Sequence, residues 1–304
     1  MSIDNLIENI KLKKSPIVVG LDPKFENLPK YIQERYIDDD GLTLETAAKS
    51  IYKFNRMLID AVYDLVPAIK PQIAYYEMYG HYGLRAFELT VKYAKTKGLY
   101  VIADAKRNDI GTTCEAYAKA YLGNVSIGET VCTPVGADAL TVNAYLGYDG
   151  VKPFLDVCKE LDKSIFVLAK TSNKSSGELQ DLEVDKKPVY EIMGEYCEEW
   201  GKGSVGKNGY SAVGAVVGAT YPEQLTALRK KLPHTFFLIP GYGAQGGTAA
   251  DIKGAFDGDG IGGIVNSSRG IIYAYMKEGC DEREFAEAAR REVIRMKLEL
   301  NATA

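Results

Sequence analysis

The segment VIADAKRNDIG (101–111) begins like a buried strand and ends in a cluster of charged side chains. Alternate side chains of an extended strand point to the same face, so Asp104 and Lys106 share one face while alanines occupy the other. Asp109 follows in the turn before the next helix. A carboxylate and an ammonium that pair away from water hold each other in a fixed position and protonation state. We therefore expect chemistry performed by lysine and aspartate side chains.

Lys70 adds a second cation from a neighbouring strand. It ends the apolar run VPAIK (66–70), and adjacent parallel strands lie about 4.8 Å apart, so its ammonium can enter the same space. The expected quartet in one desolvated pocket is Lys70, Asp104, Lys106 and Asp109. A structural ion-pair network is the alternative, and it would explain an isolated Asp-x-Lys better than catalysis does. The additional lysine and the polar residues that end other strands favour a functional site.

A second group of residues has the properties of an anion site. LIPGYGAQGG (238–247) is a glycine-rich loop whose backbone N–H groups can approach an anion closely. Gln245 in this loop offers an amide donor, and Arg269 in IVNSSRGI (264–271) can bind a phosphate through two parallel hydrogen bonds. The glycine-rich loop alone is a weak signal, but the arginine after the next strand strengthens it. We therefore predict a phosphate site here.

The composition excludes several other classes of protein. The net charge is −4 without a basic tract, which argues against a nucleic-acid partner, and no apolar run approaches the roughly 18 residues of a membrane span. The first 16 residues predict an amphipathic helix and no signal peptide, so we expect a cytoplasmic protein. Two histidines, and five cysteines without a CxxC pair, disfavour a metal site, a disulfide framework and a Ser-His-Asp relay.

The elements that must position these groups alternate between apolar runs and helical segments. Eight runs predict strands covered on both faces, at 16–21, 66–70, 99–105, 138–143, 164–170, 212–219, 236–240 and 261–266. Helices are expected between them, for example at 44–65, 83–97, 113–122, 189–200 and 222–232, with a closing helix at 282–300. This pattern predicts an α/β protein with one (β/α)8 TIM-barrel domain over 1–304, in which 173–211 is an insertion.

Polar residues collect where these strands end. Such positions are held by Asp22, Lys70, Asp104, Lys106, Asn143, Lys170, Ser172 and Arg269. The carboxyl ends of barrel strands form the rim that carries the active site, and the loops after the seventh and eighth strands are the usual phosphate site of this fold. The two groups of residues are therefore expected at one rim.

Five motifs, in this order along the chain, resemble those of orotidine 5′-phosphate decarboxylases. They are GLDP (20–23), IKPQIAYYE (69–77), DAKRNDIGTT (104–113), PGYGAQGG (240–247) and SSRG (267–270). The third fits the specific signature D-x-K-x-x-D-I-x-x-T, and the match runs roughly from Pro16 to Gly270. The longer 173–211 segment and NSSRGI are similar to the longer bacterial subtype of that family.

The resemblance implies a role for each matching residue. The charged quartet would be the catalytic network, and Asp109, Ile110 and Thr113 would reach across a homodimer interface into the partner's active site. Asp22 would contact the ribose, and Ser172 the pyrimidine. Pro240, the first residue of the PGYGAQGG motif, would also contact the substrate. The phosphate would be bound by Gln245 and Arg269. Ser268 stands where many relatives have glycine, so no backbone phosphate contact is assigned there.

The activity implied is the decarboxylation of orotidine 5′-phosphate to UMP in pyrimidine biosynthesis, without a cofactor or metal. Loss of CO₂ from C6 leaves a carbanion in the ring plane, which a preorganised cation must stabilise. Lys106 is the expected cation and proton donor, while the aspartates keep it charged and oriented.

Two alternatives remain open on the sequence. One is a Mg²⁺-dependent sugar-phosphate decarboxylase or aldolase of a related barrel family, against which Lys70 argues because such enzymes place a metal-binding carboxylate on that strand. The other is a non-catalytic nucleotide-phosphate binding protein. Four buried charges would contribute little to binding alone, which disfavours it.

Overall fold

The computed structural model describes residues 2–243 and 246–303, and within them eight parallel strands close into a barrel. In chain order the barrel strands are β1 (Ile17–Leu21), β2 (Ala68–Pro71), β3 (Tyr100–Arg107), β6 (Ala139–Val142), β7 (Ser164–Lys170), β10 (Val213–Val217), β11 (Phe237–Ile239) and β12 (Gly263–Ser267). Each strand pairs with the next, and β12 pairs with β1 to close the ring. The eight predicted runs each contain or overlap one of these strands, which confirms the predicted TIM barrel.

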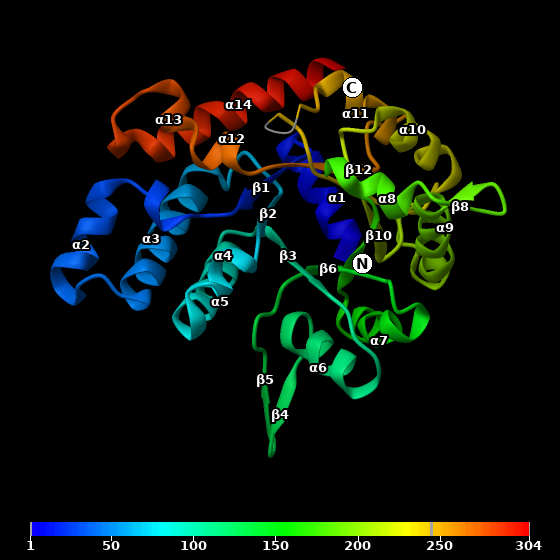
Figure 1. Cartoon of the computed structure of the whole chain (residues 1–304), viewed down its shortest axis with the longest axis horizontal. Coiled ribbons are helices and arrows are strands. Elements are labelled where there is room, and N and C mark those ends of the chain that lie inside the picture. Colours follow the sequence, from blue (N-terminus) through cyan, green and yellow to red (C-terminus); the bar gives the residue numbers. More distant parts are fainter. Residues whose placement is uncertain (1, 244–245, 304) are drawn as a thin grey trace.

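Helices surround the barrel and follow its strands (Figure 1). The α-helices are α1 (Ser2–Lys13), α2 (Lys30–Asp40), α3 (Leu44–Val62), α4 (Ala74–Glu77), α5 (Gly80–Thr96), α6 (Gly111–Tyr121), α7 (Lys152–Leu161), α8 (Gly177–Gln180), α9 (Val189–Gly201), α10 (Pro222–Lys231), α11 (Ala249–Ile252), α12 (Arg269–Ile272), α13 (Ala274–Glu278) and α14 (Phe285–Thr303). The short 3₁₀ turns are η1 (Phe25–Asn27), η2 (Tyr148–Gly150), η3 (Lys174–Ser176), η4 (Lys202–Ser204), η5 (Lys253–Ala255) and η6 (Glu282–Glu284).

The N-terminal helix closes the amino end of the barrel. Its apolar residues recur at helical spacing and are buried with side chains of the barrel interior, and they are Ile3, Leu6, Ile7 and Ile10. Phe166 and Phe236 are fully buried in the same cluster. The interior of the barrel is therefore packed with apolar side chains at its amino end.

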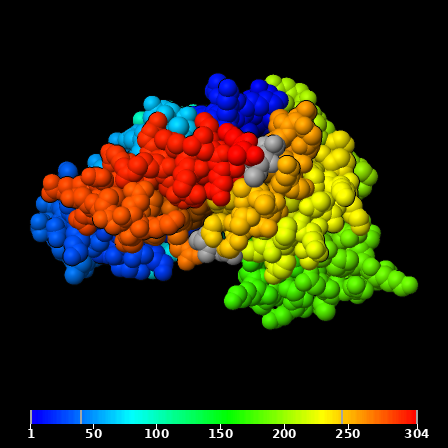
Figure 2. All heavy atoms as spheres, turned by 90° about the horizontal axis from the view of Figure 1, so that it is seen from above, coloured from blue at the N-terminus to red at the C-terminus, as the bar shows by residue number. Residues whose placement is uncertain are grey.

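The outward faces of the strands pack on the helices in a second, larger core. Strand residues such as Val19, Val101 and Val167 meet helix residues such as Phe54 and Phe87 there. Strands buried on both faces need apolar side chains at nearly every position, which is why their sequences read as continuous apolar runs. The last helix, α14, contacts α3, α12 and α13, so the C-terminal helix (red in Figure 2) completes the wall beside N-terminal elements.

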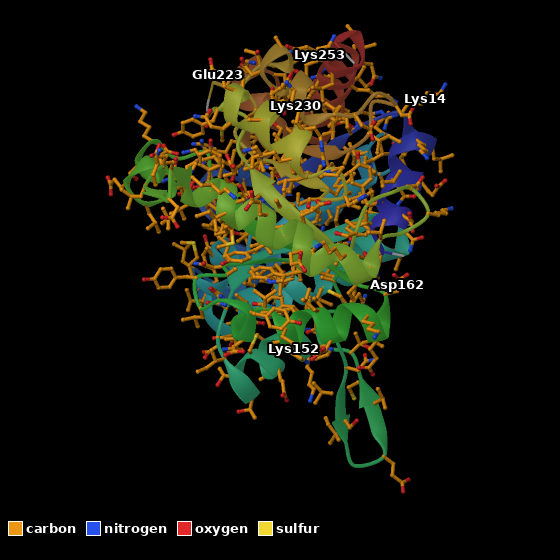
Figure 3. The ribbon with its side chains drawn as sticks, turned by 90° about the vertical axis from the view of Figure 1, so that its right-hand side faces the viewer. Lys14, Lys152, Asp162, Glu223, Lys230 and Lys253 are labelled. Atoms are coloured by element: carbon orange, nitrogen blue, oxygen red, sulfur yellow. The ribbon has the colours of Figure 1, made fainter. Side chains whose placement is uncertain are left out.

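Two small antiparallel hairpins extend the barrel. The first, β4 (Val125–Ile127) with β5 (Thr130–Cys132), projects from the body after α6 (Figures 1 and 3). The second, β8 (Glu183–Val184) with β9 (Lys187–Pro188), lies within the expected insertion. The helix in that region, α9, packs on β7 and β10 and is therefore a barrel helix. The α9 part of the expected insertion thus belongs to the barrel wall, and an insertion within 173–211 stays a prediction.

Among the described residues, no helix has the length and apolar character needed to span a membrane.

Candidate active site

The carboxyl end of the barrel holds a cavity of about 250 Å³ between the strand ends. Its wall contains Lys70, Asp104, Lys106, Thr141, Leu168, Thr171, Ser172, Asn173, Val216, Leu238 and Pro240. A larger hollow of about 640 Å³ lies at the opposite end, near α1 and α14, away from the paired lysines and aspartate. The smaller cavity is the candidate active site, because in this fold reacting groups are built at the carboxyl rim.

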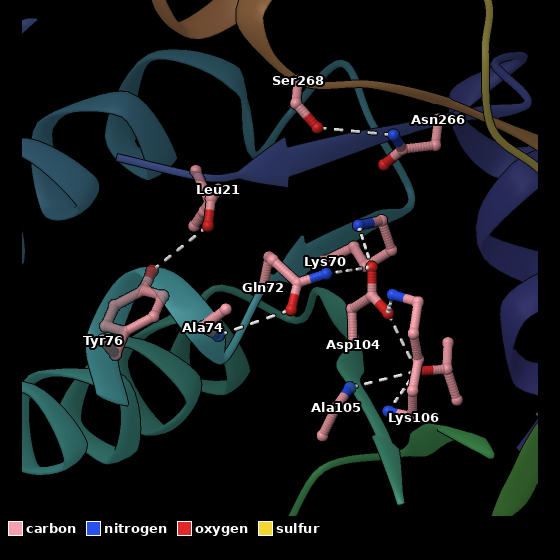
Figure 4. Close-up of polar contacts among 11 residues, drawn as sticks. Leu21, Lys70, Gln72, Ala74, Tyr76, Asp104, Ala105, Lys106, Asn266 and Ser268 are labelled. Atoms are coloured by element: carbon pink, nitrogen blue, oxygen red, sulfur yellow. Dashed lines mark hydrogen bonds and ion pairs between the residues drawn. The ribbon is translucent and has the colours of Figure 1, made fainter. Parts of the chain in front are cut away.

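Asp104 is the centre of the polar contacts in this cavity (Figure 4). Its Oδ2 accepts hydrogen bonds from Lys70 Nζ at 2.7 Å and from Gln72 Nε2 at 3.0 Å. Its Oδ1 accepts from Lys106 Nζ at 2.6 Å and from Thr141 Oγ1 at 2.9 Å. An ionised carboxylate has about four acceptor positions, so all of them are used. Asp104 is thereby fixed in place, with each carboxylate oxygen accepting two hydrogen bonds from protein donors.

Burial and charge act in opposite directions on these groups. Burial disfavours the Asp104 carboxylate, but the ammonium groups of Lys70 and Lys106 outweigh it and hold the pKa of Asp104 well below its usual range. Burial likewise lowers the pKa of Lys70, yet the carboxylates of Asp104 and Asp22 hold it above its usual value. The pair is therefore charged at neutral pH in a site from which water is largely excluded.

Lys106 reaches Asp104 from a bulge, and the expected simple alternation of the strand is wrong at this point. The pairing of β3 with β6 shifts register between Ala103 and Arg107, and Lys106 has a φ of 49°. This left-handed conformation is uncommon for residues other than glycine. The Lys106 side chain is 45% exposed, whereas that of Lys70 is 6% exposed, so the expected fully desolvated quartet is also wrong. Lys106 presents its ammonium to the open side of the cavity.

Asp109 does not join the other three charges within this chain, which corrects the expected single pocket for the quartet. It is half-buried in the turn after β3, where its Oδ1 accepts from the N–H of Ile110 at 2.8 Å. Among the described residues no ion pair connects it to either lysine. Ile110 is 55% exposed and Thr113 is exposed on α6, so this segment faces outward from the barrel.

Asp22 follows β1 and stands beside the charged group. Its negative charge contributes to the raised pKa of Lys70. Its Oδ1 is buried, and the described residues offer this oxygen no hydrogen-bond partner. A buried carboxylate oxygen without a donor is costly, so it is suited to accept a hydrogen bond from a bound hydroxyl.

Ser172 lines the cavity from a loop that is hydrogen-bonded to α8. The amide side chain of Gln180 accepts from Thr171 N at 2.9 Å and donates to Thr171 Oγ1 at 2.7 Å. A Cβ at Gly218 would lie 2.8 Å from Ser172 Cα, so the glycine lets the loop approach β10. The loop is thus held at the cavity wall from both sides.

Lys170 precedes this loop but does not line the cavity, although the sequence placed it among the rim groups. A register shift between Val216 and Val217 of β10 changes its side of the strand. Its side chain is fully buried, contacts Asp181 Oδ1 at 2.5 Å and lies 4.3 Å from the centre of the Tyr221 ring. Lys170 therefore ties the segment around Asp181 to the outside of the barrel.

The glycine-rich loop after β11 differs from the expected anion cradle. The N–H groups of Gly243, Gly246 and Gly247 donate to carbonyls within the loop, at 2.8, 2.9 and 3.1 Å. They stabilise the turn itself, so the expected backbone grip on an anion is not formed by these three groups. Pro240 lines the cavity, whereas Gln245 lies outside the described residues.

Arg269 is the first residue of α12, next to the end of β12. It is exposed, and no described residue forms an ion pair with it. Asn266 and Ser268 precede it, with Asn266 Nδ2 donating to Ser268 Oγ at 3.4 Å, and the buried Oδ1 of Asn266 has no partner among the described residues (Figure 4). The guanidinium is thus available to an anion at this rim.

Two of the residues that donate to Asp104, Gln72 and Thr141, were not assigned from the sequence. Thr141 lies two positions before Asn143, which was expected at the rim but is exposed and accepts from the N–H of Tyr145 instead. Strand alternation could have identified Thr141, because it shares the face of Ala139, whose side chain lies in the barrel interior. Gln72 follows the end of β2 directly, so the position that identified Asp22 after β1 could have identified it as well.

Comparisons with known proteins agree with this geometry. The chain matches the family described as "Orotidine 5'-phosphate decarboxylase / HUMPS family" over residues 15–279. An orotidine 5′-phosphate decarboxylase of Rhodopirellula baltica is 46% identical over 286 residues, with 93% of each chain covered. That of Caldicellulosiruptor bescii is 44% identical over 272 residues, which cover 90% of this chain and 89% of the relative.

A solved structure is similar over the same length. The OMP decarboxylase of Leishmania donovani superimposes with a TM-score of 0.71 and 31% identity, and the alignment covers 98% of both chains. Both the sequence match and the fold extend across the barrel and its rim. The chain therefore belongs to the orotidine 5′-phosphate decarboxylase family.

Proposed function

We propose that this protein decarboxylates orotidine 5′-phosphate to UMP, a step of pyrimidine biosynthesis. The relatives that carry this name match nearly the whole chain. The observation that carries the proposal is the Asp104 carboxylate bound between the ammonium groups of Lys70 and Lys106 at the cavity wall. A charged group of this kind supplies a fixed cation, which the loss of CO₂ from C6 requires.

Lys106 is the proposed catalytic residue. The bond between C6 and the carboxylate breaks, CO₂ leaves, and the electron pair stays on C6 in the plane of the ring. The Lys106 ammonium stabilises this pair and then transfers a proton to C6, which gives UMP and a neutral lysine. Its 45% exposure lets solvent return the proton.

Asp104 sets the position of this lysine, and Lys70 holds Asp104 in place. Asp104 binds Lys106 through one oxygen and Lys70 through the other, so the carboxylate cannot turn without breaking both contacts. The proposed reaction needs no cofactor or metal, because the ammonium supplies the positive charge and the proton. This assignment separates the proposal from Mg²⁺-dependent sugar-phosphate chemistry, in which a metal would polarise the substrate.

The rest of the substrate would follow the rim from Asp22 to Arg269. The unpartnered Oδ1 of Asp22 would accept from a ribose hydroxyl, and Ser172 would contact the pyrimidine beside Pro240. The cavity of about 250 Å³ is smaller than the about 300–1,000 Å³ typical of ligand pockets, so the phosphate would lie outside it. The exposed Arg269 would bind it there, with Gln245 as a second proposed ligand.

We further propose a homodimer with shared active sites. Asp109 lies outside its own charged group, and the Ile110 beside it is 55% exposed. A nearby loop carries further exposed apolar side chains, those of Tyr145, Leu146 and Tyr148. A hydrogen bond from Asn108 to Gly150 connects this loop to the segment around Asp109. An exposed apolar patch of this kind favours a protein partner. A second copy would cover it and receive Asp109 and Thr113 in its active site.

A cytoplasmic location is proposed on the state of the cysteines. All five are free thiols, and disulfide-free chains are typical of reducing compartments.

An ultraviolet assay with orotidine 5′-phosphate, run with and without EDTA, tests the function. We expect conversion to UMP at the same rate in both. Activity that disappears in EDTA and returns with Mg²⁺ would instead support the sugar-phosphate alternative. Binding of UMP without any conversion of orotidine 5′-phosphate would support a non-catalytic nucleotide-binding protein.

A further inference from the structure

We infer that Thr141, on β6, is a positioning residue that sets the conformation of Lys106. This inference rests on the proposed role of Lys106. Thr141 is 1% exposed and lies at the cavity wall, and its hydroxyl joins the backbone of β3 to the carboxylate of Asp104. Thr141 thereby contacts both the backbone of Lys106 and the carboxylate that binds the Lys106 ammonium.

The first part of the argument is the bulge itself. Between the pairs Ala103–Leu140 and Arg107–Val142, β3 advances by four residues while β6 advances by two. The N–H groups inside a bulge lose their partners on the neighbouring strand, and a buried N–H without a partner is costly. The hydroxyl oxygen of Thr141 accepts from both Ala105 N and Lys106 N, each at 3.0 Å. It thus replaces the contacts that the regular ladder would have provided.

The second part is the backbone of Lys106. Its φ of 49° lies in a region that side chains other than glycine seldom occupy, and such a conformation persists only where surrounding contacts enforce it. The hydrogen bond from Lys106 N to Thr141 is one such contact. Without it, the residue is free to relax toward an ordinary strand conformation, and its ammonium would leave its present position.

The third part is the hydrogen of the same hydroxyl. Thr141 Oγ1 donates to Asp104 Oδ1 at 2.9 Å, and this oxygen also accepts from Lys106 Nζ at 2.6 Å. A hydroxyl has one donor and two acceptor positions, and all three are used here. The labelled side chains in Figure 4 show how Asp104 and Lys106 meet while Ala105 lies beside them. Both ends of Lys106 are therefore held through Thr141.

The test compares Thr141→Val, which removes the hydroxyl at nearly constant shape, with Thr141→Ser, which keeps it. We expect kcat for orotidine 5′-phosphate to fall about 10²-fold in the valine variant, the loss that a misplacement of about 1 Å can cause. KM should change by less than about threefold, because the binding contacts remain in place. The serine variant should retain kcat within about threefold of the wild type.

Thr90→Val is the matched control. Thr90 is also a fully buried threonine; its hydroxyl donates to Ala86 O and accepts from Asn55 Nδ2, and it does not line the cavity. Its loss should lower stability and leave kcat unchanged.

If Thr141→Val cannot be purified, Thr141→Ala removes the same hydroxyl and takes its place. A folded variant without the hydroxyl that keeps kcat within threefold would overturn the inference, as would a serine variant as slow as the valine one. Wild-type protein that does not convert orotidine 5′-phosphate would overturn the proposed function instead.

Discussion

Lys106 Nζ lies 2.6 Å from Oδ1 of Asp104, two residues back along the same strand, although a bulge separates the two backbones. The bulge changes the direction of the lysine without breaking its ion pair. Lys70 approaches the other carboxylate oxygen from the neighbouring strand. The cation that is 45% exposed is thus the one on the irregular strand, while the cation on the regular strand is buried.

Replacing Lys106 with alanine tests the proposed role directly. The substitution removes both the stabilising charge and the proton donor, so we expect turnover to fall by about 10⁴-fold or more. UMP binding, measured by calorimetry, should largely survive because the proposed ribose and phosphate contacts remain. Lys95→Ala is the control, since this lysine pairs with Asp138 at the amino end of the barrel, before the start of β6. Near-normal turnover in Lys106→Ala would reject the assignment.

Replacing Asp104 with asparagine tests the electrostatics of the pair. Lys70 would then stay buried without its main counterion, and breaking a buried pair in this way costs about 3–5 kcal/mol of unfolding free energy. The pKa of Asp104 is lowered in the folded protein. Its stabilising contribution is therefore complete above its unfolded pKa of about 3.9 and is lost as the pH falls through the folded value.

Denaturant unfolding of both proteins at several pH values measures this. The stability difference between wild type and Asp104→Asn should be constant from about pH 5 to pH 8 and should shrink below about pH 4. A difference that grows on acidification would show that Asp104 is not held as a carboxylate by its two lysines.

Much of this site could be anticipated from the sequence. The eight apolar runs located the strands because each strand is buried on both faces. Since the strands of the barrel are parallel, the residues that follow them lie at the same rim. The pairing of Lys70 with Asp104 follows from adjacent strands in that order. Asp22 and Arg269 followed in the same way, since Asp22 comes directly after β1 and Arg269 comes two residues after the end of β12.

The rest depended on contacts between segments that are distant in sequence. The bulge at Lys106 is enforced by a hydroxyl on β6, so alternation within β3 could not predict it. The N–H groups of Gly243 and Gly247 could have faced either an anion or their own loop, and glycine content alone does not decide between these. Similarly, Lys170 changed side because of a register shift with β10.

The pair of Lys170 and Asp181 gives a prediction about the segment that follows β7. Asp181→Asn leaves a fully buried ammonium without the carboxylate that pairs with it. Because Asp181 itself is 44% exposed, water can replace part of the contact, and we expect a loss of about 1–3 kcal/mol in unfolding free energy. KM for orotidine 5′-phosphate should rise, because the loop that carries Ser172 begins beside Lys170.

Asp156→Asn provides the matched control for that variant. Asp156 pairs with Lys152 on the outer surface of α7, where Figure 3 shows the lysine, and both side chains are more than half exposed. Exposed pairs of this kind contribute about 0.2–1 kcal/mol, so stability and KM should hardly change. Equal effects of the two substitutions would contradict a special role for the buried pair.

Shared active sites can be tested by mixing two inactive variants. We expect Lys106→Ala and Asp109→Ala each to have little activity, the first through the loss of the proton donor and the second through the loss of the residue that enters the partner's site. In a mixed dimer one site carries both substitutions and the other carries neither, so subunit exchange should restore activity. Random exchange at equal concentrations makes about half of the dimers mixed, with one intact site in each, which predicts about a quarter of the wild-type rate. Complementation measured after brief exposure to mild denaturant should reach this value. A mixture that stays inactive while mixed dimers are shown to form would mean that Asp109 serves the active site of its own chain.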